Sequence, residues 1–294
     1  TKTAPADRHE VNNSGLIRTP PAFGLTRDEN DAVIDAVCDG PVDSVSLIPV
    51  GPAFEDAVER CRKRDLAVGI HLGLIYERPL SSVNTIPSLV TKQGRFYRDY
   101  RQFCWNYGLG TIKMNQLETE IRAQIERVVD TKLTISHLDS HQHLHMLPGI
   151  FSIVLKLMRE YRISNVRIPD EWFRGRSCVS PSVWGLKLLS KWARRQTGTH
   201  SFTSNDRFWG VGLKGPPSDR LFKRFLSNAS FGISEIGIHI STQRTSNGSG
   251  RYDSGRKLQK MYKWVMSSRF KQMLEAFDTN QVSWKQLDRT PETG

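Results

Sequence analysis

The chain has 294 residues, of which 38% are hydrophobic and 24% are charged, and its formal net charge is +12. This length and balance suit a compact protein with one large core, and no run approaches the ~18 apolar residues of a membrane span. The first 15 residues lack the apolar segment of a secretory signal, so we expect a cytoplasmic protein without a membrane span. Four widely spaced cysteines with no C-x-x-C pair indicate neither a zinc ribbon nor a disulfide framework.

The basic residues bear on the partners of the chain. A charge of +12 favours polyanions in general, so a nucleic-acid binder is one rival interpretation. The Lys and Arg residues are spread over several segments, however, and are not interleaved with the aromatic side chains on which single strands stack. We therefore expect solvated outer helix faces, and nucleic acid is not the expected partner.

Taken in chain order, the segments alternate between strand and helix patterns. Residues 1–15 are polar and are expected to be disordered or loosely attached, ahead of one domain over residues 16–294. A strand at 42–51, a helix at 52–64 and a strand at 66–74 follow. Residues 76–100 contain two prolines and no clear period, which is typical of a lid or substrate loop.

The alternation continues through the second half of the chain. The pattern predicts a helix at 114–130, a strand at 133–141, a helix at 148–161, a short strand at 165–170, a helix at 182–195, an irregular stretch at 196–217, a helix at 218–229, a strand at 234–241, a helix at 254–276 and a strand at 281–287. Strands regularly separated by helices indicate parallel β-α-β units, in an open α/β sheet or a barrel.

Two strands help to choose between sheet and barrel. In residues 66–74 small residues and His71 take one set of alternate positions, and large aliphatic residues take the other. Residues 234–241 repeat this pattern with His239. An open parallel sheet covered by helices would be apolar on both faces, so the pattern favours a (β/α) barrel with a functional mouth.

The segment SHLDSHQHLHML, residues 136–147, places four histidines and one aspartate within nine positions. A strand would align His137, Asp139 and His141, and a helix would align His137, His141 and His145. The β-branched residues before the segment and the proline after it favour a strand to about His141, followed by a loop with His143 and His145. Because strand ends and the following loops form the reactive face of such barrels, the cluster could meet other strand-end histidines there.

These residues suggest a metal site. Neutral imidazoles on rigid strands suit a divalent transition metal, with water in the open positions. Asp139 could accept a hydrogen bond from a neighbouring histidine and orient it. The alternative is that any one of the histidines is an interior, hydrogen-bonded side chain, but four within nine residues are costly to bury without a purpose.

Two motifs, HLDSHQHLHMLP and GIHLGLIYERPL, resemble the YdjC-like carbohydrate deacetylase family, which includes chito-oligosaccharide deacetylases and hopanoid-biosynthesis relatives. The segments SVSLIPVGPAFEDAV, NVRIPDEW and EIGIHI support the resemblance by their order. It implies an α/β fold, an irregular TIM-like (β/α) barrel that is often a homodimer. It also implies a divalent metal ion, Mg²⁺ or Zn²⁺, that helps to remove acetyl from N-acetylated sugars or oligosaccharides.

The resemblance also implies roles for individual residues. His71 and His141 would be metal ligands, and His239 the general acid. Asp139 is the second catalytic candidate, because it lies close to the expected ligands. The candidates for substrate binding are Arg167, His143, His145 and Trp209. The arginine could fix a substrate oxygen or form an ordinary ion pair, and the tryptophan could stack on a sugar ring or pack in the core.

One departure from the family concerns its first strand, which ends N-A-D-D-F-G with a general base and then a metal ligand. This chain reads TPPAFGLT, so Pro21 and Ala22 stand at the two positions. Neither side chain can take a proton or bind a cation. The two prolines also predict a poor strand over residues 15–24.

Two functions therefore stay open. The chain is a carbohydrate deacetylase in which Asp139, Asp28 or Glu29 replaces the lost acid, or it is a catalytically silent carbohydrate-binding protein on the same fold. A two-histidine site without its carboxylate should hold a hard cation such as Mg²⁺ badly. The presence of Pro21 and Ala22 fits a natural pseudoenzyme, a site in which another residue supplies the acid, or a sequence altered at this point.

Overall fold

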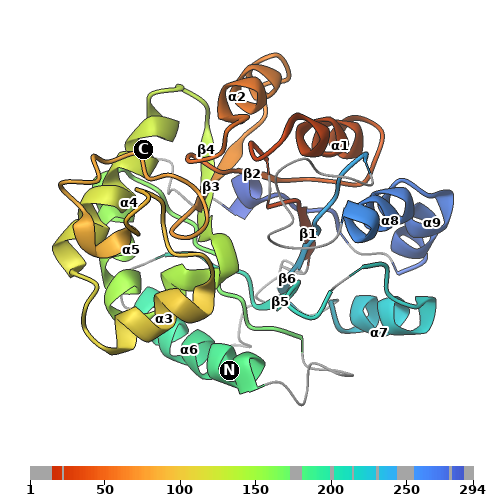
Figure 1. Cartoon of the computed structure of the whole chain (residues 1–294). Helices are drawn as coiled ribbons and strands as arrows, with labels where there is room; N and C mark the ends of the chain where they lie inside the picture. The colour runs from red at the N-terminus through yellow and green to blue at the C-terminus, as the bar shows by residue number, and fades with distance from the viewer. Residues whose placement is uncertain are drawn as a thin grey trace, which may run out of the picture.

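Two parallel three-stranded sheets lie at the centre of the molecule, and helices surround them (Figure 1). The computed structural model describes residues 15–21, 23–172, 181–198, 202–213, 215–229, 232–243, 255–277 and 280–287. In the first sheet β6 (Ile233–Gly237) lies between β1 (Gly15–Thr19) and β5 (Arg207–Trp209). In the second, β3 (Val68–Leu72) lies between β2 (Val45–Leu47) and β4 (Ile135–Ser140).

The helices follow the strands in alternation, which confirms the predicted α/β class. They are α1 (Arg27–Cys38), α2 (Phe54–Arg62), α3 (Tyr100–Gly108), α4 (Met114–Val129), α5 (Pro148–Glu160), α6 (Pro181–Gly198), α7 (Asp219–Ala229), α8 (Gly255–Val265) and α9 (Ser268–Glu275). Short 3-10 helices cover Pro87–Leu89, His141–Met146 and Trp284–Leu287. None of these helices combines the length and hydropathy needed to span a lipid bilayer.

Several boundaries differ from the prediction, for local reasons. Strand β1 forms in spite of the two prolines because they come after its last residue, Thr19, and remove no donor from the ladder. The irregular stretch at 196–217 contains β5, which has only three residues. The strand predicted at 281–287 is a bridge at Gln281 followed by a 3-10 helix, and the helix predicted at 254–276 is divided into α8 and α9.

Isolated bridges connect the two sheets on both sides. On one side Phe23, which follows β1 of the first sheet, pairs with Leu47 of β2 in the second sheet. On the other side Val166 pairs with Leu138 of β4. Glu171 pairs with Phe208 on β5, so residues 165–171 lie between the two sheets as a strand-like segment without regular strand geometry. Closure into a barrel stays a prediction. Residues 1–14, which cover nearly all of the segment expected to be loose, and Ala22 lie outside the described residues.

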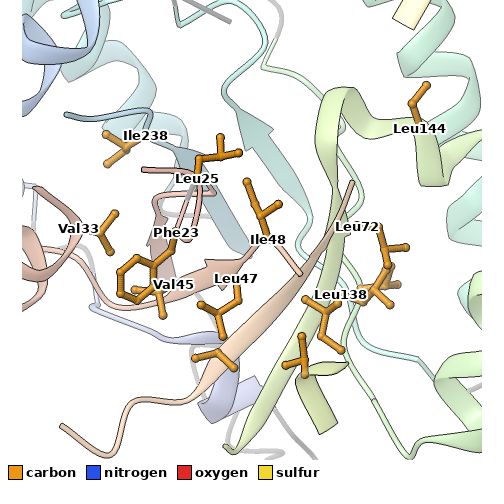
Figure 2. Close-up of a cluster of buried hydrophobic side chains, with 14 of the residues drawn as sticks. Phe23, Leu25, Val33, Val45, Leu47, Ile48, Leu72, Leu138, Leu144 and Ile238 are labelled. Atoms are coloured by element: carbon orange, nitrogen blue, oxygen red, sulfur yellow. The ribbon is translucent and has the colours of Figure 1, made fainter. Parts of the chain in front are cut away.

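The core fills the space between the strands and the helices. Figure 2 shows Phe23 among side chains of α1 and β2, with Leu47, Leu72 and Leu138 following on the three strands of the second sheet. These are the aliphatic positions of the alternating pattern. The intervening positions therefore point to the other face of the strands, where the histidines lie.

Gly69 on β3 leaves room for a buried imidazole. The ring of His137 stacks on Trp284 with centroids 4.8 Å apart, and a methyl group at position 69 would overlap with that ring. We predict that Gly69→Ala lowers the free energy of unfolding by about 1–3 kcal/mol through overpacking. Urea denaturation measures this change. The matched control is Gly185→Ala in α6, where nothing lies within 4 Å of the added methyl group and the gain of helix propensity should stabilise the fold. Equal effects of the two substitutions would contradict the prediction.

Candidate active site

Three neighbouring strands bring the side chains of a serine, a histidine and an aspartate together. His71 on β3 is paired in register with Asp139 on β4, and its Nδ1 lies 2.9 Å from Asp139 Oδ1. Ser46 on β2 donates its hydroxyl to the same oxygen at 2.7 Å. A carboxylate only accepts, so the imidazole carries its proton on Nδ1 and keeps a lone pair on Nε2.

The turn after β4 carries two further histidines, His141 and His143, and His141 contacts His71. Gln142 and His143 both adopt the left-handed conformation, with φ of 50° and 56°. The ring of His141 meets that of His71 edge to face, with centroids 5.4 Å apart and planes at 90°. The ring of His143 contacts Phe208 of β5, with centroids 5.2 Å apart.

His239 follows the end of β6 by two residues and is half-buried. It lies close enough to His71, His141 and His143 that its charge contributes to lowering the pKa of all three. The structure thus brings four of the predicted histidines together at the carboxyl ends of β3, β4 and β6. This is the face on which (β/α) proteins carry their reactive groups.

Burial is the main cause that keeps these imidazoles uncharged. It lowers the pKa of His71, His141 and His143 well below the usual range of histidine, and neighbouring positive charges lower it further. For His71 the largest of these charges belongs to Arg167. At neutral pH each ring therefore offers a nitrogen lone pair and not a positive charge.

Arg167 pairs with two buried carboxylates. Its Nη1 donates to Asp139 Oδ2, and its Nε and Nη2 donate to the two oxygens of Glu235 at 2.8 and 2.6 Å. The indole of Trp284 also donates to Glu235, at 3.1 Å. Arg167 is 1% exposed, and its guanidinium holds the two carboxylates in place. A contact between Arg167 and substrate stays a prediction. Asp139, which accepts from Arg167, Ser46 and His71, is placed to orient the histidine.

Three other predicted residues lie in packing positions. His145 is fully buried, with its Nδ1 2.6 Å from Ser140 Oγ and its Nε2 2.9 Å from the Arg167 carbonyl oxygen. His137 is stacked beneath Trp284. Trp209 is 4% exposed and packs against Phe225 of α7, with ring centroids 4.8 Å apart. The structure therefore does not bring these side chains to an open surface of the site.

The described residues supply part of a metal site. His71 is oriented through Nδ1 by a carboxylate, as metal-binding histidines usually are, and His141 lies beside it. Yet no group of three or more His, Cys, Asp or Glu side chains within the described ranges is arranged to hold an ion. Glu29, one of the candidate replacements, lies in the first turn of α1, where its amide donates to the Thr26 hydroxyl at 3.2 Å and its Oε2 accepts from that hydroxyl at 3.1 Å. The residues present do not fit a complete metal centre.

Sequence reasoning missed several residues that shape the site. Glu235 lies four positions before His239 and therefore shares its strand face. The alternation of side chains along this strand could have indicated that Glu235 belongs to the site. Ser46 carried no signal, because a lone serine in a strand is common. Glu120 and Gln124 interrupt the apolar face of α4, and both are fully buried against the loop after β3. A polar pair among the buried positions of a helix could have indicated that contact.

The chain is similar to known proteins over most of its length. A profile of the family described as YdjC-like protein matches residues 23–276. A carbohydrate deacetylase of Brevibacillus brevis is 37% identical over 161 residues, which cover 54% of this chain and 60% of that protein. A carbohydrate deacetylase of Mus musculus is 29% identical over 208 residues, which cover 68% of this chain and 66% of that protein. The chain thus spans less than two thirds of the length of these relatives.

A solved structure shows the same fold. A protein from Enterococcus faecalis V583, provisionally named a cellobiose-phosphate cleavage protein, superposes with a TM-score of 0.74 at 22% identity. The superposition covers 94% of this chain and 99% of that one. The arrangement of strands and helices is therefore shared over nearly the whole length.

The burial of His145 predicts a stability that falls in acid. Burial lowers the pKa of His145 to about 4, whereas the unfolded chain takes up this proton near its ordinary pKa of ~6.5. Between these values the unfolded state binds more protons, so stability falls as pH falls. We predict that His145→Gln removes this contribution of His145 to the pH dependence of stability. The stability advantage of the wild type over the variant should then shrink by about 2 kcal/mol from pH 7.5 to pH 5. Urea unfolding at the two pH values measures it, and parallel losses in both proteins would contradict it.

Proposed function

The chain belongs to the YdjC-like protein family, and on that premise we propose that it is a carbohydrate deacetylase that hydrolyses the acetamide of an N-acetylated sugar. The observation that carries the proposal is the gathering of His71, His141, His143 and His239 at the ends of three parallel strands. The relatives named carbohydrate deacetylase support the substrate class. We also propose that the bridges between the two sheets close them into one irregular (β/α) barrel around this site.

Amide hydrolysis needs a proton acceptor for the attacking water and a proton donor for the leaving nitrogen. His239 is the proposed donor, because it is half-buried after the end of β6 and lies near His71 and His141. The proposed proton acceptors for the attacking water are His71 and His141, whose rings are neutral. The hydrogen bond to Asp139 leaves the Nε2 lone pair of His71 available, so Asp139 acts as a positioning residue.

A metal ion would be held by His71 and His141 in the family pattern, but the described residues do not complete its ligand set. The proton transfers above therefore rest on the side chains of the chain alone. A histidine with a strongly lowered pKa is a weak base, so we expect slow turnover.

A second candidate function is sugar binding without turnover. The observation that favours it is Pro21, which is buried just beyond β1 where the family carries its catalytic aspartates. Acetate release from N-acetylated chito-oligosaccharides, measured together with calorimetric binding and metal analysis, separates the two functions. Binding without acetate would support the second function, and acetate release would support the first.

Replacement of the proposed proton donor should slow the chemical step. We predict that His239→Gln lowers kcat for acetate release by ~10²–10⁴ and changes KM little, because general acid catalysis supplies a factor of this size. The matched control is His145→Gln, a buried histidine away from the open side of the cluster, which should keep kcat within about threefold. An unchanged kcat in a folded His239→Gln variant would assign the donor role elsewhere.

Restoring the family aspartates should strengthen the site. We predict that the double variant Pro21→Asp, Ala22→Asp gains ~10²–10⁴ in rate and binds a divalent ion, since it would regain a base and a carboxylate ligand. Acetate release and metal content of the purified protein measure the two effects. A folded double variant with neither gain would contradict the proposal that these positions limit the activity.

A further inference from the structure

Tyr76 has a backbone conformation that bulky residues rarely adopt. It follows β3 by four residues, and its φ is 71°, in the left-handed region that favours glycine. Such conformations persist only where the surrounding structure fixes them, and they concentrate at functional sites. The left-handed conformation of Tyr76 therefore has to be explained by the contacts of its loop.

Two sets of hydrogen bonds fix this loop. The Tyr76 amide donates to the Tyr97 carbonyl at 2.9 Å, and the Phe96 amide donates to the Glu77 carbonyl at 3.0 Å. On α4, Gln124 bonds to both backbone groups of Gly73, at 2.9 and 2.7 Å. Glu120 accepts from the amides of Leu80 and Ser81, at 3.1 and 2.9 Å. The strained residue is thus held from both ends by groups that are themselves buried.

The ring of Tyr76 lies at the edge of the histidine cluster. It meets the ring of His141 edge to face, with centroids 5.8 Å apart and planes at 87°, and it is half-buried. Other aromatic candidates lack one of these two properties. Phe208 contacts His143 but is only 3% exposed, and Trp105 is 69% exposed on the outer helix α3. Tyr76 combines contact with the cluster and access to solvent.

We propose that Tyr76 is a specificity-determining substrate contact, whose ring packs against the sugar ring that carries the acetamide. This inference rests on the proposed function. The C–H face of a pyranose is apolar and suits an aromatic surface such as the ring of Tyr76. Because the loop is fixed in advance, binding does not have to order the side chain, and the acetamide is held beside His71 and His141.

The direct test uses N,N′-diacetylchitobiose as the probe. Tyr76→Ala should raise both the calorimetric Kd and the KM for acetate release by about tenfold, the size expected for loss of one aromatic contact, with kcat changed less than about twofold. Tyr76→Phe, which keeps the ring, should stay within about threefold of the wild type. The matched control is Tyr262→Ala, which removes a half-buried tyrosine bonded to Asp35 between α8 and α1 and should leave Kd and KM unchanged.

A second variant tests the backbone strain without relying on substrate. Tyr76→Gly relieves the left-handed conformation, so its melting temperature should equal or exceed that of Tyr76→Ala, whereas glycine in ordinary loops is the less stabilising of the two. Its loss of binding should match that of Tyr76→Ala. A glycine variant less stable than the alanine variant would overturn the strained placement.

The outcomes separate this inference from the proposed function. If the wild type neither binds nor hydrolyses the probe, the proposed function fails and the role of Tyr76 fails with it. If the wild type binds the probe and Tyr76→Ala binds it equally well, only the role of Tyr76 is overturned. A tenfold loss confined to Kd and KM supports both.

Discussion

The buried pairing of Arg167 with Asp139 and Glu235 is the interaction on which the rest of the site depends. Removing three charges from water is costly, and the cost is offset only when every donor and acceptor is satisfied. Here the guanidinium contacts both carboxylates, and Ser46 and His71 share the other oxygen of Asp139. Trp284 donates to Glu235 Oε1, which also accepts from the guanidinium. The pairing therefore fixes the relative positions of β4, β6 and the segment between the two sheets.

That network also sets the electrostatics of the histidines. Asp139 orients His71, and the positive charge of Arg167 opposes protonation of the same ring. One buried arginine thus contributes to both the geometry and the neutrality of the cluster. Because Arg167 is 1% exposed, these interactions with its buried neighbours are shielded from solvent.

The sequence allowed much of this to be predicted, because the alternation of small and aliphatic residues directly encodes the two faces of each strand. The α/β class, the elements around His71 and His141 and the loop after β4 follow from such local patterns. The family follows from the resemblance of the two histidine-bearing motifs. What could not be predicted depends on pairing between distant segments. The partners of Arg167 become known only when β4 and β6 are placed, and β5 is too short to give a period. The burial of Trp209 depends on α7, which lies ten residues further along the chain.

The two left-handed residues after β4 have a consequence for how such a site could diverge. Gln142 and His143 lie after the last residue of β4 and adopt left-handed angles, so the direction of the His143 imidazole depends on the backbone of this turn and not on the sheet. A change confined to this turn could redirect His143 and alter the polarity around the histidine cluster while the buried ion pairs of Arg167 stay intact. New substrate preferences could then arise in this fold by exchange of a four-residue corner, at little cost to its stability.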